Sequence, residues 1–185
     1  MFNERKAAQM AAFFLGQVPG SRMSHLKLMK LLYISEREAV RSFGLPISGD
    51  RLVSMPHGPV LAMTLNLMDG DVESRPGGWE EWISDKENHE LSLREPLDPN
   101  SLDELAPAEI EVLSSVWKQF GSMTKWEIRD WTHQHCKEWE DPRGSSIPIT
   151  YKRLAQAVGF DDVTADELAS QIQAEQDIDR LFAAL

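Results

Sequence analysis

An amphipathic pattern between residues 24 and 43 constrains the fold of this chain more than any other feature. Apolar side chains recur there every three or four residues, which places them on one face of an α-helix. They are Leu28, Met29, Leu32, Tyr33, Ala39, Val40 and Phe43. Four basic residues fall on the other side, namely Lys27, Lys30, Arg37 and Arg41. We predict a long helix whose apolar face packs in a core and whose basic face is solvated and pairs with the chain's own acidic loops.

Similar patterns that end at glycine or proline predict further helices. The predicted helices cover residues 3–16, 24–43, 59–68, 107–120, 124–135, 150–158 and 164–185. Pro59 suits the first turn of its helix, because a backbone N–H is not needed there. Thr124 with Glu127 forms a capping-box pattern, in which each residue satisfies a backbone N–H of the other. Thr164 and Glu167 repeat that pattern, so the chain is predicted to consist mostly of capped helices.

Alternating apolar residues indicate one small β-hairpin, in which residues 79–85 pair with residues 90–94. Residues 45–58 are rich in proline and glycine, so we predict an irregular or briefly extended segment there. A chain of 185 residues without an internal repeat or a long linker suits a single domain. The sequence therefore predicts a mainly α (α+β) fold, a compact helical domain with a small β-hairpin.

The net charge of −11 is concentrated in two segments. Residues 67–111 hold fourteen acidic and three basic side chains, and residues 161–185 hold seven acidic and one basic. An acidic surface repels phosphate backbones and attracts cationic partners, so we expect no direct nucleic-acid binding. No stretch approaches the about 20 apolar residues of a membrane-spanning helix, and the single cysteine requires no oxidising compartment. A cytoplasmic protein without membrane contact is expected.

Signatures of common enzymes are missing from the sequence, which has no phosphate-binding loop, Rossmann glycine fingerprint or nucleophile elbow. His133, His135 and Cys136 form the best metal candidate, but two histidines two positions apart point about 200° away from each other on a helix. We therefore expect no catalytic residue, no cofactor and no metal site. The alternative that stays open is a small enzyme in which His57 and His133 move protons.

Tryptophans cluster near the histidines, at Trp126, Trp131 and Trp139. Tryptophan combines a large apolar area with one N–H that needs a partner when it is buried. The cluster is therefore interpreted as a corner of the core, with an exposed anchor for a partner as the alternative.

Three sequence elements resemble the motifs of one known family. Lys27-Leu28-Met29-Lys30-Leu31-Leu32-Tyr33 is similar to its Lys-Leu-x-Lys-Leu-Leu-Tyr helix, Gly58-Pro59-Val60 to its Gly-Pro-Val turn, and Trp131-Thr132-His133 with Trp139 to its Thr-His element followed by Trp. Their order and spacing resemble the Panacea domain, the SocA-like antitoxin family of bacteria, prophages and phages, over roughly residues 5–155. His57 stands where the family pattern has an aromatic residue.

This resemblance implies that the chain is an antitoxin that binds and neutralises a cognate protein toxin by direct contact. Members of the family pair with toxins of many unrelated folds. One branch acts instead as a proteolytic adaptor that delivers its toxin to a bacterial protease, and this is the alternative function. The resemblance carries over no catalytic residue, so the chain is expected not to be an enzyme.

Charge adds a prediction of the contact surface. Toxins that attack RNA or nucleotides present cationic surfaces, which acidic side chains complement. The partner-binding candidates are Glu80, Glu81, Asp161, Asp162, Asp166 and Glu167. We expect residues 1–160 to form the Panacea-like domain and residues 161–185 to form an acidic amphipathic helix, either part of the same unit or a partner contact. Its apolar stripe of Ile178, Leu181, Phe182 and Leu185 is also a candidate contact for a homodimer.

Overall fold

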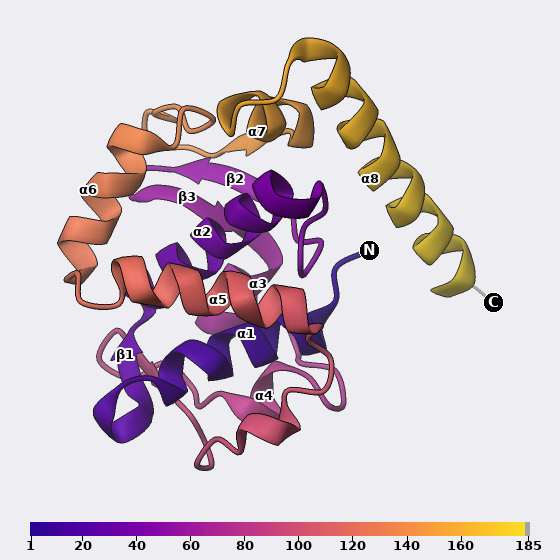
Figure 1. The fold of residues 1–185 in the computed structure, drawn as a ribbon. Coiled ribbons are helices and arrows are strands. Elements are labelled where there is room, and N and C mark those ends of the chain that lie inside the picture. Colours follow the sequence, from indigo (N-terminus) through magenta and orange to yellow (C-terminus); the bar gives the residue numbers. More distant parts are fainter. Residues whose placement is uncertain (184–185) are drawn as a thin grey trace.

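The computed structural model describes residues 1–183, which form helices packed around a central helix with two small sheets (Figure 1). The elements in chain order are α1 (Glu4–Gly16), β1 (Arg22–Ser24), α2 (His25–Phe43), β2 (Leu52–Met55), β3 (Gly58–Leu61), α3 (Ala62–Asp69), α4 (Trp79–Trp82), β4 (Glu90–Ser92), α5 (Pro107–Phe120), α6 (Lys125–His135), β5 (Ile147–Ile149), α7 (Tyr151–Ala157) and α8 (Asp162–Ala183). Short 3-10 turns lie at Pro19–Ser21 and Pro99–Ser101. The predicted mainly α class with a few strands is confirmed.

Helix α2 lies at the centre and contacts α1, α5, α6, α7 and the edge strand β3. Its apolar residues are buried as predicted, except Phe43, which is exposed at the last turn. The prediction of a solvated basic face is wrong for two residues, because Lys30 and Arg37 are buried. Neighbours cover α2 on nearly every side, so its charged residues must find partners inside the protein.

A three-stranded antiparallel sheet has the order β3-β2-β5. Leu52 of β2 lies opposite Leu61 and Ile149, and this row of three side chains is buried in the core. Strands β2 and β3 form a hairpin, in which β2 lies in the segment predicted as irregular or briefly extended and β3 covers the start of the predicted helix of residues 59–68. Pro59 therefore lies in a strand and not in the first turn of a helix, which corrects the predicted start of α3.

The first turn of α3 is capped from a distance. Asp50 accepts hydrogen bonds from Met63 N at 2.9 Å and from Thr64 N at 2.8 Å. A carboxylate at this position satisfies backbone N–H groups that have no partner within the helix. Because the cap comes from a residue that precedes the hairpin, no local pattern could place the start of α3.

The predicted hairpin of residues 79–94 is confirmed only in part. Residues Trp79–Trp82 form a helical turn, α4, and β4 pairs instead with β1, so that Leu91 lies opposite Met23. The two sides of the predicted hairpin do meet, since Ile83 forms a bridge with Leu93, Ser84 N donates to Ser92 O at 2.9 Å and Arg94 N donates to Trp82 O at 3.0 Å. The partner strand β1 has three residues, which is too short to leave an alternating pattern in the sequence.

Helix α8 follows α7 and then runs along the outside of the molecule as an arm (Figure 1). Asp161 caps it by accepting from Thr164 N at 2.9 Å, so Asp161, not Thr164 as predicted, is the capping residue. Ala165 and Ile172 are buried and mark the side that faces the body. Leu185, the last residue of the predicted apolar stripe, lies outside the described residues. Within residues 1–183 no helix is both long and apolar enough to span a membrane.

Candidate functional site

Residues of the three sequence motifs meet where α2, β3 and α6 come together. Lys30 Nζ donates a hydrogen bond to Pro59 O at 2.6 Å, which links the first motif to the second. Gly58 has a φ of 93°, and a Cβ atom built on it would lie 2.8 Å from Thr132 Oγ1. Only glycine combines this backbone conformation with so close an approach. The second motif therefore packs directly on the third.

Burial dominates the electrostatics of Lys30. It lowers the pKa of the Lys30 ammonium from 10.5 to about 7. The loss of hydration disfavours the charged form of a buried lysine. The ammonium therefore titrates near neutral pH in the folded protein and near 10.5 in the unfolded chain.

Lys30→Met is expected to remove a pH dependence of stability. Between pH 7 and 10.5 the unfolded chain holds a proton that the folded protein has released, so wild-type stability rises with pH. The difference between the free energies of unfolding of the wild type and of Lys30→Met should shift by about 2 kcal/mol in favour of the wild type between pH 7 and pH 9. Urea unfolding at both pH values measures this. A constant difference between the two proteins would contradict the burial of a titrating Lys30.

A second buried network joins α2 to the loop after α6. Tyr33 OH and Arg37 Nε both donate to Glu138 Oε1, each at 3.0 Å. Glu138 and Tyr33 are fully buried, and Arg37 is nearly so. Sequence reasoning assigned Tyr33 to the core and missed the other two, because their charges are typical of solvated positions. The only hint in the sequence is that charged residues interrupt an otherwise apolar helix.

The histidines and Cys136 occupy packing positions. The His133 ring stacks on Trp139 at a centroid distance of 4.3 Å, and His135 stacks on Trp131 at 4.6 Å, so the two rings face different tryptophans. Burial and the adjacent Glu138 carboxylate raise the pKa of Cys136 well above its ordinary value, so its thiol stays protonated. Residues 1–183 contain no group of three or more His, Cys, Asp or Glu side chains arranged to hold a metal ion.

The tryptophan cluster is divided between core and surface. Trp131 packs edge-on against Phe120, and Trp139 Nε1 donates to Met55 O at 3.0 Å. Both are half-buried, as expected for a corner of the core. Trp126 is 50% exposed, with the Lys125 and Arg129 cations against its ring.

The acidic partner-binding candidates fall into two groups that the fold keeps apart. Glu80 and Glu81 lie on α4, whereas the others lie at the beginning of α8, on another side of the molecule (Figure 1). Within the second group, Asp161 caps α8, Asp162 accepts from Gln156 at 2.8 Å, and Asp166 pairs with Lys152 at 2.8 Å. Asp162 and Asp166 thus also fix α8 on α7, whereas Asp161 holds the first turn of α8.

The end of α8 exposes large apolar side chains. Ile178 is 52% exposed, Leu181 71% and Phe182 72%. Helical spacing places Ile178 and Phe182 on neighbouring turns of one flank, with Leu181 beside them. The side chains that face the body, such as Ile172, lie on a different side of the helix. Apolar residues gathered on an exposed flank of this kind are typical of a binding surface.

A comparison with protein-family models matches residues 28–140 to the family described as Antitoxin SocA-like, Panacea domain. The chain belongs to this family. The matched segment holds the sequence-motif residues from Leu28 to Trp139, so the buried junction of α2, β3 and α6 lies inside the Panacea domain. No curated protein and no solved structure matches the chain.

The Panacea match ends at Glu140, before β5, α7 and α8. The shared domain thus contains the buried polar networks, whereas the projecting helix with its acidic and apolar flanks lies beyond it. The two parts have different physical characters. The motif residues lie at the buried junction of α2, β3 and α6, and the end of α8 carries exposed apolar side chains.

Proposed function

We propose that this chain is an antitoxin that neutralises a protein toxin by direct contact, and that α8 supplies the main contact. Membership of an antitoxin family supports the general role. The observation that carries the choice of surface is the exposed apolar flank at Ile178, Leu181 and Phe182, on a helix outside the family segment. In this proposal residues 1–160 are the shared domain and residues 161–185 are the partner contact.

Two flanks of α8 define the chemistry of the partner. Asp162, Asp166 and Asp177 follow helical spacing along one flank, and the exposed apolar residues lie along another. A helix of this type docks in an apolar groove whose rim is cationic. Toxins that act on RNA or nucleotides need cationic surfaces for their own substrates, so α8 would cover the surface with which such a toxin works.

A second copy of this chain is a poorer occupant of the same flank. Two α8 helices lying side by side would bring two acidic segments together, each with seven acidic residues and one basic residue. Like charges at such short range oppose association. Charge therefore favours a cationic toxin over a homodimer.

The role is tested by expressing the reading frame next to this gene, alone and together with it. Direct neutralisation predicts arrested growth in the first case, normal growth in the second, and an undiminished amount of toxin in the rescued cells. A toxin that disappears faster in the presence of this protein would favour the proteolytic adaptor. A neighbour that is harmless on its own would contradict the antitoxin role.

The acidic contribution is tested with Glu167→Gln. Glu167 is exposed and lies on α8, whereas the other three candidates on α8 also hold that helix in place. Loss of this charge should weaken toxin binding about two- to five-fold at low salt, with less effect at high salt. Glu80→Gln is the comparison for the acidic group on α4.

A further inference from the structure

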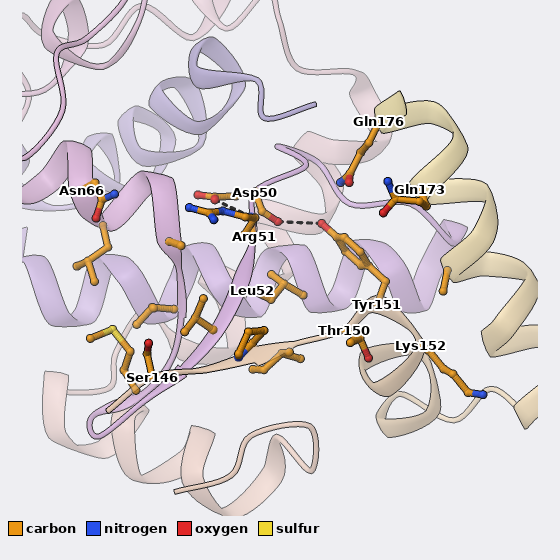
Figure 2. Close-up of a pocket in the computed structure, with 18 residues that line it drawn as sticks. Asp50, Arg51, Leu52, Asn66, Ser146, Thr150, Tyr151, Lys152, Gln173 and Gln176 are labelled. Carbon is orange, nitrogen blue, oxygen red and sulfur yellow. Dashed lines mark hydrogen bonds between the residues drawn. The ribbon is translucent and has the colours of Figure 1, made fainter. Parts of the chain in front are cut away.

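A groove of about 660 Å³ lies between the β3-β2-β5 sheet and the side of α8 that faces the body (Figure 2). The sheet forms its floor, α3 borders it at Asn66, and α8 borders it at Gln173 and Gln176. Its volume falls in the range of sites that bind small molecules or short peptide segments.

The floor of this groove is apolar. Val53 of β2 lies opposite Val60 on one neighbouring strand and opposite Pro148 on the other, so the three side chains form a row across the sheet. All three line the groove, and Met55 extends the row. The alternate row, centred on Leu52, supplies the core, so this sheet has apolar residues on both faces. An apolar face beside an open groove is suited to an apolar ligand.

The borders of the groove are polar and mostly uncharged. Asn66 lies at one end, and Gln173 and Gln176 lie at the other (Figure 2). Side-chain amides both donate and accept hydrogen bonds, which matches the N–H and C=O groups of a peptide backbone. The combination of apolar floor and amide borders fits a peptide segment.

Arg51 gives the groove a cation. Its backbone N–H is held by Asp50 Oδ1 at 2.6 Å, and its guanidinium contacts the Met63 sulfur at 3.8 Å. Among the side chains that the structure describes, which leave out those of residues 179, 180 and 183–185, no carboxylate lies within ion-pair distance of Arg51, whereas Lys152 in the same groove is paired with Asp166. Guanidinium groups bind carboxylates in a two-pronged geometry. A ligand that complements the groove would therefore bring a carboxylate to Arg51.

We infer that this groove binds a peptide segment of the toxin, with an apolar side chain on the Val53 row and a carboxylate on Arg51. The inference rests on the proposed function, because the toxin supplies the segment. The segment lies against the inner side of α8 while the body of the toxin covers the outer flank, so α8 is held on two sides. The toxin then presents a cationic surface to the outer flank of α8 and one carboxylate of its own to Arg51.

Toxin binding by Arg51→Gln tests the occupant. Arg51 is exposed, so the substitution leaves folding intact, and loss of its charged hydrogen bonds should weaken binding of the neighbouring gene's product about ten-fold or more. Arg75→Gln is the matched control, since Arg75 is also exposed but lies away from the groove. Equal affinities of the two variants would overturn the inference and leave the proposed function standing.

A second measurement examines the chemistry of the groove without any toxin. The probe is the fluorescent dye anilinonaphthalene sulfonate, which joins an apolar ring system to one anion, and its uncharged counterpart is phenylnaphthylamine. Arg51→Gln should weaken binding of the anionic dye about ten-fold and leave the uncharged dye unchanged. Equal effects on both dyes, or none on either, would overturn the pairing of Arg51 with an anion, whatever the neighbouring gene encodes.

Discussion

Leu181→Ala combined with Phe182→Ala is expected to abolish toxin neutralisation while the protein stays folded. Both side chains are more than 70% exposed, so their truncation removes little buried area within the chain. At the centre of an interface, the loss of two large apolar side chains weakens binding about 100-fold or more. Isothermal titration of the purified toxin measures the affinity, and growth rescue measures the consequence in cells.

Trp126→Ala is the matched control for this double variant. Trp126 is also a large exposed aromatic residue, but it lies on α6 and not on α8. Its truncation should change toxin affinity by less than about two-fold, since residues outside an interface contribute little. If Trp126→Ala were the variant that lost binding, the contact would lie on α6 and the proposed surface would be wrong.

Glu138→Ala is expected to cause the largest loss of stability among single substitutions of the buried networks. It would leave the buried Arg37 guanidinium without its closest carboxylate and Tyr33 OH without an acceptor. Removing one partner of a buried ion pair costs about 3–5 kcal/mol, because the other charge stays buried without compensation. Urea unfolding at neutral pH measures the change in the free energy of unfolding.

Glu140→Ala provides the comparison two residues along the chain. Glu140 pairs with Arg153 at 2.9 Å, a distance close to that of Glu138 and Arg37, but Glu140 is exposed and Arg153 is partly exposed. Exposed pairs contribute about 0–1 kcal/mol, so Glu140→Ala should be nearly neutral. Similar losses in the two variants would show that burial of the Glu138 network contributes little.

Local signals in the sequence were enough to place most helices. The Pro107 start and Gly121 end of α5, and the Thr124–Glu127 capping box of α6, lie within single short segments and appear in the structure as predicted. Such features depend on hydrogen bonds between residues three or four positions apart. Both partners of such a hydrogen bond therefore lie in one short stretch of the sequence.

Long-range partners explain what the sequence did not predict. Asp50 caps α3 from a position before the intervening hairpin, and β4 pairs with β1 across more than sixty residues of chain. Lys30 is buried because Pro59 O accepts its hydrogen bond, and Arg37 because Glu138 meets it. No local pattern names these partners, so a charged residue with a distant partner is predicted as solvated.

The candidate contact surface was likewise predictable where it depends on local spacing and not where it depends on distant segments. The apolar and acidic composition of α8 was visible in the sequence, because helical spacing alone assigns each residue to a flank of the helix. The groove was not visible, since it is assembled from β2, β3, β5, α3 and α8, and Arg51 gave no signal of its own. The exposure of Leu181 and Phe182 is likewise known only once the helix is seen to project from the body.

Hydrogen–deuterium exchange of the full chain, with and without the toxin encoded next to it, tests direct contact through α8. The proposal predicts that the strongest toxin-dependent protection of backbone amides falls in residues 163–182, with weaker protection in β2 and β5. The buried α2 should change little, because its amides are protected before binding. A complex that forms with exchange in α8 unchanged would contradict the central claim.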